Sequence, residues 1–313
     1  MEAILGPSWA PAHTSPIDLP GRQAPRRHFF DGDSQYRVKV QRYSQAPPEV
    51  TVQKVDMTRD QRAYLRAAET GLARVPGPRR SSKNEDEPRS KESLERSQHR
   101  AKTAVRKRVL ELAPTALLTL TSRGILTDID KAVAAWEMFT RLVRRVYPDI
   151  EYVAVPEWHH SREHLHIHAA IRARVNHHTL RRLWHITLCA LTGRPRPDAI
   201  LRNGEAPGNV DLSTPKGTDK VSRFRRIGKY ISKYITKDMI VEFGRRRYWP
   251  SKGINLEAAQ VFWLDSLDMS EGVREACGLL GIPHDGVAPQ VKQFFCPSDR
   301  FFWFALDSPG PSS

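Results

Sequence analysis

The chain has 313 residues, with 50 Lys and Arg against 35 Asp and Glu, which gives a formal net charge of +15. Apolar residues make up 39% and charged residues 27%, as in globular proteins that bury a core. No run of about 18 apolar residues occurs, which excludes a membrane-spanning helix and predicts no membrane partner. The first residues lack the features of a secretory signal peptide, and the three widely spaced cysteines fit neither a disulfide framework nor a zinc knuckle. These features predict a cytoplasmic protein.

The charge is distributed unevenly. Residues 1–250 carry a net charge of +19, whereas residues 251–313 carry −4. A polyanion such as nucleic acid is therefore the expected partner of the first part. The alternative is a basic protein whose charge only keeps it soluble.

Residues 1–100 predict a basic, proline-rich, partly disordered N-terminal arm. Within it, residues 58–73 predict one short helix that ends at the cluster of Pro76, Gly77 and Pro78. Residues 79–100 are dense in charged side chains without apolar periodicity, which predicts a linker or a solvated helix.

Regular periodicity begins at residue 101 and predicts a domain over 101–250. Helices are expected over 101–112, 131–147, 177–191 and 220–243, and strands over 115–122, 151–158, 163–175 and 208–212. Thr127 or Asp128 is the expected cap of the second helix. Strands that neighbour one another, with helices between them, predict an α+β fold. Residues 251–313 predict a small aromatic C-terminal segment.

Residues 164–172 alternate between polar and apolar side chains, as a strand with one buried face requires. The predicted core set is Leu165, Ile167, Ala169 and Ile171, and the opposite set is His164, His166 and His168. Side chains two residues apart lie about 6.5–7 Å apart on one face, so His166 and His168 can bind one metal ion. The alternative is that the imidazoles are only the polar face of an amphipathic strand.

A carboxylate is the expected third ligand. Glu157 ends the preceding strand, which is expected to pair with the histidine strand, and its carboxylate can reach the same ion. Glu163 is nearer in sequence but has the opposite strand parity. The remaining histidines of this region are expected on the surface of loops and a helix: His159, His160, His177 and His178.

Tyr230 and Tyr234 are four residues apart, which places them on one face of the last predicted helix. Lys229, Lys233 and Lys237 repeat at the same spacing on an adjacent face, and residues 214–247 carry a net charge of +8. The alternative is a basic amphipathic helix with two half-buried tyrosines. Next to a metal-binding strand, however, phenols and ammonium groups favour a chemical role.

That role is attack on a phosphodiester. A phenol has a pKa near 10, so it is a poor nucleophile until its charged form is favoured by an ammonium group or a metal ion. The tyrosine then holds the phosphate as a covalent ester while the 3′-hydroxyl leaves. Two tyrosines one helical turn apart allow two successive cleavages.

Three segments resemble, in order, the motifs of the HUH endonucleases, specifically the rolling-circle replication initiators of bacteriophages and plasmids. LLTLTS (117–122) is similar to their first motif and HIHAAI (166–171) to their metal motif. YISKYITKD (230–238) is similar to the two-tyrosine motif of phage gene A-type initiators and filamentous-phage relatives. Glu157 stands where several family members place a carboxylate ligand. The resemblance covers about residues 100–250.

This resemblance implies a roughly five-stranded antiparallel sheet with helices packed on its faces and the tyrosine helix lying across it. It implies a divalent cofactor, Mg²⁺ or Mn²⁺, held by His166, His168 and Glu157. Tyr230 and Tyr234 would act as nucleophiles in alternating cleavages, with Tyr234 preferred if only one acts. By the same resemblance, Lys233 and Lys237 would stabilise phenolate or phosphate charge.

The implied substrate is single-stranded or origin DNA in a bacterial host cell, nicked to leave a 5′-phosphotyrosine link and a free 3′-hydroxyl primer. No Walker A loop occurs in the sequence, so a host helicase and a host polymerase are the expected partners. Basic residues are expected to contact DNA phosphates and to make binding salt-dependent. The candidates are Arg225, Arg226, Lys229, Arg245, Arg246 and Arg247.

Other interpretations stay open. A transposase of the same superfamily would be expected to carry a zinc-binding cysteine cluster, which three scattered cysteines do not supply. A conjugative relaxase would have three histidines on its metal strand, as here, but an N-terminal tyrosine. A non-enzymatic nucleic-acid-binding protein would bind without metal and form no covalent product.

Overall fold

The computed structural model describes residues 34–56, 91–159, 163–195, 206–214, 219–235, 247–264, 268–279, 291–296 and 301–306. The fold is α+β, as the sequence predicted, and the described residues fall into two compact units. The larger unit contains residues 42–48 and the described part of 91–258, and the smaller contains 34–41, 49–56 and the described part of 259–306. No helix in these described ranges combines the length and the apolar character that a bilayer crossing requires.

The larger unit is built on an antiparallel five-stranded sheet with the strand order β6-β3-β5-β4-β7. Its strands are β3 (Ala116–Ser122), β4 (Glu151–Trp158), β5 (Leu165–Arg172), β6 (Gly208–Ser213) and the short β7 (Trp249–Pro250). The histidine strand β5 is therefore the central strand, paired with β3 on one side and β4 on the other.

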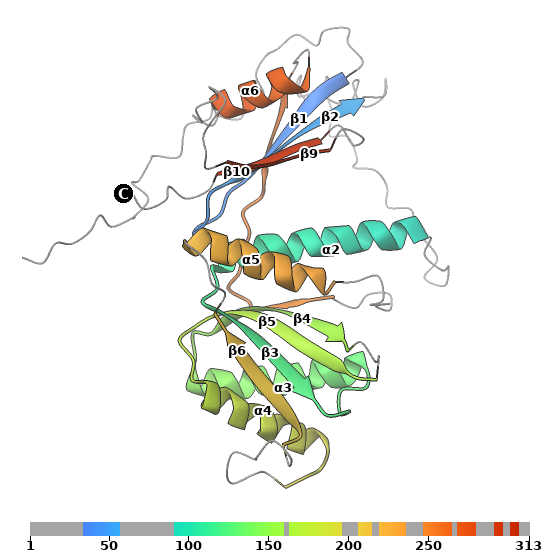
Figure 1. Ribbon diagram of the computed structural model, residues 1–313, viewed down its shortest axis with the longest axis vertical. Coiled ribbons are helices and arrows are strands. Elements are labelled where there is room, and N and C mark those ends of the chain that lie inside the picture. The colour runs from blue at the N-terminus through green and yellow to red at the C-terminus, as the bar shows by residue number, and fades with distance from the viewer. Residues whose placement is uncertain are drawn as a thin grey trace, which may run out of the picture. The chain divides into compact units, whose positions relative to one another are not determined.

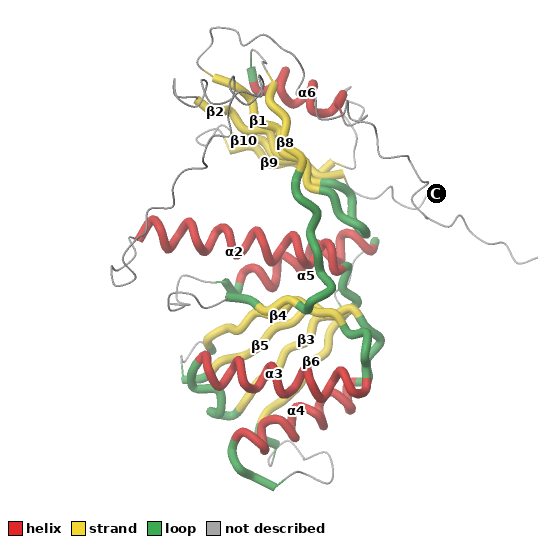
Figure 2. The backbone as a smooth tube through the Cα atoms, turned by 180° about the vertical axis from the view of Figure 1, so that it is seen from behind, coloured by secondary structure: helices red, strands yellow, loops and turns green. Residues whose placement is uncertain are grey.

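Helices cover both faces of this sheet (Figures 1 and 2). One face carries α2 (Lys91–Leu112) and α5 (Lys220–Lys233), and the other carries α3 (Ile129–Val146) and α4 (His177–Leu191). The chain order from α2 to α5 is the order that the periodicity predicted. The helix α2 starts ten residues earlier than expected, within the segment interpreted as part of the arm.

The alternation along β5 separates two hydrophobic cores. The predicted core residues of β5, from Leu165 to Ile171, pack with Phe139 of α3 and Trp184 of α4. Ala170 has the opposite parity and packs with Ile227 and Ile231 of α5. His168 has the parity of Ala170, so its side chain belongs to the face that α5 covers.

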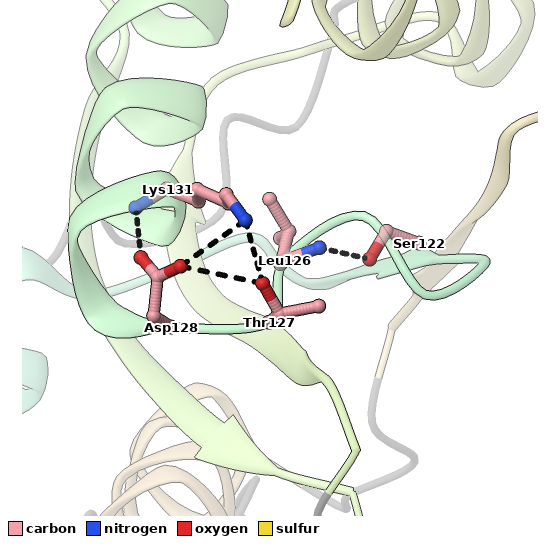
Figure 3. A network of polar contacts seen from close by, with 5 residues as sticks. All are labelled: Ser122, Leu126, Thr127, Asp128 and Lys131. Atoms are coloured by element: carbon pink, nitrogen blue, oxygen red, sulfur yellow. Dashed lines mark hydrogen bonds and ion pairs between the residues drawn. The ribbon is translucent and has the colours of Figure 1, made fainter. Parts of the chain in front are cut away.

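Asp128 is the N-cap of α3, and its Oδ1 accepts a hydrogen bond from the backbone N–H of Lys131 at 2.8 Å. Lys131 Nζ also donates to Thr127 Oγ1 at 2.8 Å, and the N–H of Leu126 donates to Ser122 Oγ at 3.2 Å (Figure 3). These bonds tie the end of β3 to the start of α3. The sequence left Thr127 and Asp128 as alternatives, and the cap is Asp128.

Gly208 at the start of β6 lies closer to its neighbours than any side chain would allow. An added Cβ would be 2.1 Å from the carbonyl oxygen of Thr121 and 2.7 Å from a methyl carbon of Leu188. His185 of α4 is fully buried here, and its Nε2 lies 3.1 Å from the carbonyl oxygen of Gly208. Glycine at this position lets β6 and α4 approach each other.

The smaller unit is a second antiparallel sheet with the strand order β8-β1-β2-β10-β9. Its strands are β1 (Ser34–Gln41), β2 (Glu49–Asp56), β8 (Gln260–Leu264), β9 (Val291–Cys296) and β10 (Phe301–Leu306). The helix α6 (Met269–Leu279) packs on one face of this sheet, over Val38 and Val52 (Figure 1).

This unit differs from the expectation of a loose arm over 1–100 and a separate small segment over 251–313. Residues 36–40 and 50–52 place Tyr36, Val38, Val40, Val50 and Val52 in a buried row at period two. Their partners β8 and β10 lie more than 200 residues away in sequence, so the pairing buries both segments together. The helix predicted over 58–73 lies outside the described residues.

Candidate metal and tyrosine site

The imidazole of His168 is held from three sides. Its Nδ1 lies 3.2 Å from Thr119 Oγ1 on the neighbouring strand β3, and its Nε2 lies 2.8 Å from Glu157 Oε2 on β4. Its ring stacks on the ring of Tyr234, with centroids 4.1 Å apart and planes 11° from parallel. The side chain of His168 is only 5% exposed. The structure thus brings one predicted imidazole ligand and the predicted carboxylate ligand into direct contact.

Both tyrosines of α5 lie next to His168. The ring of Tyr230 is 6.0 Å from the imidazole, edge to face, and 4.9 Å from the ring of Tyr234. Tyr230 is 42% exposed, whereas Tyr234 is half-buried against the core beneath α5. The predicted metal strand and the predicted tyrosine pair therefore form one cluster of side chains.

The phenol of Tyr234 is held in its neutral form. Burial raises its pKa well above the ordinary value, and the hydrogen bond with Tyr230 and the negative charge of Glu157 raise the pKa further. A hydrogen bond that raises a phenol's pKa is one that the phenol donates, because ionisation would break it. Tyr234 is therefore the donor toward the oxygen of Tyr230.

His166 belongs to a different group of side chains from Glu157 and His168. Among the described residues, one set of three metal-ligating side chains has its ligand atoms all within 4.8 Å of one another, and it consists of His159, His164 and His166. Glu157 faces His166 across the β4–β5 pair, so the two sets adjoin. Burial lowers the pKa of His166 to about 4, and the charges of His159, His164 and His168 lower the pKa further.

The predicted lysines and arginines are placed only in part. Arg226, Lys229 and Lys233 are exposed on α5, and Arg225 is half-buried there. Arg247 is buried, with 7% of its surface exposed, so its guanidinium does not suit contact with DNA phosphates. Lys237, Arg245 and Arg246 lie outside the described residues, as does His160.

The helix α5 is shorter than predicted. It ends at Lys233, with Tyr234 as its C-cap, and the N–H groups of Tyr234 and Ile235 donate to carbonyls three residues back. Asp219 is its N-cap and accepts from the N–H of Ser222 at 2.8 Å. Tyr230 therefore sits within the helix and Tyr234 at its end. The part of the prediction beyond residue 235 lies outside the described residues.

Sequence reasoning missed three side chains of this region. Thr119 contacts His168 from another strand, and no spacing in the sequence indicates that pairing. His159 and His164 were not assigned as ligands, although the hairpin that links β4 to β5 makes them cross-strand partners. That signal was present: once Glu157 is placed opposite His166, position 159 lies opposite position 164.

Comparison with curated proteins and with solved structures gave no match. A family model for the replication-associated protein ORF2 matches residues 115–239, the stretch that runs from β3 through α5 and holds Thr119, Glu157, His168 and both tyrosines. This part of the chain is similar to replication-associated proteins, which supports a role in DNA replication.

Proposed function

We propose that this protein initiates rolling-circle replication by nicking one DNA strand at an origin and later rejoining it. A tyrosine oxygen attacks the phosphorus, the bond to the 3′ oxygen breaks, and that oxygen leaves as a hydroxyl after taking a proton. The phosphate stays on the protein as a 5′-phosphotyrosine ester, and the 3′-hydroxyl primes synthesis. The observation that carries the proposal is the contact of His168 with both phenol rings, at 4.1 and 6.0 Å between ring centroids.

Tyr230 is the better placed nucleophile for the first cleavage. Its phenol is the more exposed of the two, so a strand can reach it. Tyr234 donates a hydrogen bond toward Tyr230, which favours negative charge on the oxygen of Tyr230. The preference for Tyr234 as a lone nucleophile is therefore not retained, because its pKa is raised in this arrangement. Tyr234 would act second, after Tyr230 carries the DNA.

The exposed lysines of α5 would bind the strand next to these phenols. Lys229 and Lys233 flank Tyr230 in sequence, and their ammonium groups attract phosphate and favour phenolate. Arg226, one turn before Tyr230, extends the same basic surface. Lys237 would add to this charge. Strand separation and synthesis would be supplied by a host helicase and polymerase.

The donor set near Tyr230 fits a divalent ion. Glu157 and His168 already converge at 2.8 Å, and His166 lies on the same face of the same strand as His168, opposite Glu157. These three residues would hold Mg²⁺ or Mn²⁺, with His166 turning from its histidine neighbours toward Glu157. A bound ion would withdraw charge from a non-bridging phosphate oxygen. Thr119 fixes the orientation of His168, as partners of ligating imidazoles commonly do.

The test is formation of a covalent protein–DNA adduct. The purified chain is incubated with Mn²⁺ and a randomised pool of single-stranded DNA labelled at the 3′ end, and denaturing gel electrophoresis separates any adduct. A 5′-phosphotyrosine link keeps the 3′-labelled fragment on the protein, whereas a 5′ label leaves with the free 3′-hydroxyl fragment. We expect an adduct with the 3′ label only.

Tyrosine variants then assign the roles. Tyr230→Phe should remove most of the adduct, Tyr234→Phe should retain a single cleavage, and the double variant should form none. Tyr248→Phe, a half-buried tyrosine outside this cluster, is the matched control and should react normally. An adduct that persists in the double variant would refute the tyrosine mechanism. Metal-independent DNA binding with no adduct would favour a binding protein instead.

A further inference from the structure

Three imidazoles gather at the open end of the β4–β5 hairpin. The rings of His159 and His164 stack with centroids 4.6 Å apart and planes 14° from parallel. The ring of His166 lies 4.9 Å from that of His159 and 5.3 Å from that of His164. The proposed cleavage reaction uses only His166 of these three.

The backbone of the hairpin creates this grouping. Trp158 pairs with Leu165, and the next pair along places His159 opposite His164. The N–H of His159 donates to the carbonyl oxygen of His164 at 2.9 Å, which closes the pair. Because side chains alternate along both strands, His159, His164 and His166 all lie on the face that also carries Glu157 and His168. The three rings are thus brought together by strand pairing.

The chemistry of the two ligand sets differs. Glu157 and His168 supply a carboxylate and an imidazole, which suits a hard or intermediate ion such as Mn²⁺. The other set supplies three imidazoles and no carboxylate, and three imidazoles with one open position form a common Zn²⁺ site. The ligand atoms lie within 4.8 Å of one another, so small side-chain rotations are enough to bring all three onto one ion.

We propose that His159, His164 and His166 form an outer metal site that binds Zn²⁺, Co²⁺ or Ni²⁺ and is separate from the inner pair of Glu157 and His168. Water occupies the fourth position of the ion. The outer site has a consequence that rests on the proposed function. Since His166 serves both sets, an ion in the outer site withdraws that imidazole from the inner one, and Zn²⁺ inhibits Mn²⁺-dependent cleavage.

Co²⁺ binding by the full chain tests the site without reference to cleavage. Tetrahedral Co²⁺ absorbs strongly in the visible range, and calorimetry gives its dissociation constant. His159→Ala and His164→Ala should each abolish the tetrahedral spectrum and weaken binding at least as much as the roughly 10–100-fold caused by loss of a ligand's supporting partner. Glu157→Gln, His168→Ala and the exposed His178→Ala should retain the spectrum.

A second measurement uses the unaltered chain, so it does not depend on the folding of any variant. Diethyl pyrocarbonate modifies accessible imidazoles, and mass spectrometry of peptides locates the modified residues. Zn²⁺ should protect His159 and His164 while His178 stays reactive. Lack of protection, or equal protection of all three, would overturn the proposal.

The variant experiment has equally definite contrary outcomes. Loss of the Co²⁺ spectrum only in Glu157→Gln and His168→Ala would place the ion in the inner set. Loss in variants of both sets would mean a single shared site, and absence of Co²⁺ binding by the unaltered chain would mean no site. Each of these results overturns the proposal. If instead the adduct assay fails while Co²⁺ binds as expected, the proposed function falls and the outer metal site stands.

Discussion

The imidazole of His168 lies face to face with the phenol ring of Tyr234, with ring centroids 4.1 Å apart. Thr119 and Glu157 contact the two nitrogens of the same imidazole, at 3.2 and 2.8 Å. Since the ring is 5% exposed and contacted on its edge and on its face, its orientation is set before any strand or ion binds. His168 is therefore the fixed point of the candidate site, and Tyr230 is the accessible side chain beside it.

Replacing Thr119 by Val removes the hydroxyl at Nδ1 of His168 but keeps the volume of the side chain. We expect the rate of adduct formation to fall by about 10–100-fold, because the imidazole loses the partner that orients it. The Mn²⁺ concentration needed for half-maximal rate should rise, and Thr119→Ser should restore both values. Thr121→Val, two residues along the same strand, is the matched control. Equal effects of the two Val variants would show that Thr119 only supports the strand.

Acid should destabilise the native chain through His166. Its pKa is about 4 in the folded protein and near 6.5 in an unfolded chain, because burial and neighbouring imidazoles disfavour its charged form. Between those values the unfolded chain binds a proton that the folded chain does not bind, so stability falls as the pH drops from about 6.5 toward 4. The melting temperature, measured in EDTA from pH 7.5 to 4, should show this decrease.

The histidine variants separate the sources of that decrease. His166→Gln should flatten the dependence of the melting temperature on pH between about 6.5 and 4. Part of the decrease should remain, since burial also lowers the pKa of His185. A slope unchanged by His166→Gln would show that His166 is not the titrating group.

Much of the larger unit could be predicted because its signals are local. The alternation of residues 164–172 gave the orientation of β5, and the four-residue spacing of Tyr230 and Tyr234 placed both phenols on one side of α5. The smaller unit was missed because β1 and β2 pair with strands more than 200 residues away. A short alternating segment does not reveal its partner.

The site shows the same limit at the level of single side chains. Glu157 was predicted as a neighbour of the histidine strand because the two strands are joined by a short connection. Thr119 belongs to a strand separated from β5 by a helix and by β4, so its contact with His168 depends on sheet order. The grouping of His166 with His159 and His164 depends on the exact register of the hairpin, which hydrophobic alternation does not fix.

Ala113 ends α2 in a conformation that favours glycine, with φ of 50°. A side chain in this left-handed region costs roughly 1–2 kcal/mol, which glycine avoids. After the entropy that glycine loses on folding, Ala113→Gly should raise the free energy of unfolding by about 0.5–1 kcal/mol. Urea denaturation measures this change. Ala104→Gly, inside the same helix, is the control and should lower the free energy of unfolding by about 1 kcal/mol. A loss of stability in both variants would contradict the argument.

The cap of α5 links helix stability to the tyrosine site. Asp219 accepts from the N–H of Ser222 at 2.8 Å, just as Asp128 accepts from the N–H of Lys131 in α3. Removing either cap with Ala should cost about 1 kcal/mol of stability, and Asn should retain most of it. Only α5 carries Tyr230, so Asp219→Ala should also slow adduct formation, whereas Asp128→Ala should not.

The two caps are compared by urea denaturation and by the rate of the adduct reaction on the same preparations. The pKa of Asp128 is lowered, chiefly because its carboxylate accepts the hydrogen bond from the backbone N–H of Lys131. Its contribution to stability is therefore present above about pH 4 and decreases as the pH falls through the lowered pKa. Asp128→Asn should remove this part of the acid sensitivity while keeping the cap. Similar adduct rates for Asp219→Ala and Asp128→Ala would mean that the position of Tyr230 is set by packing against α2 and β5 and does not depend on the start of its own helix.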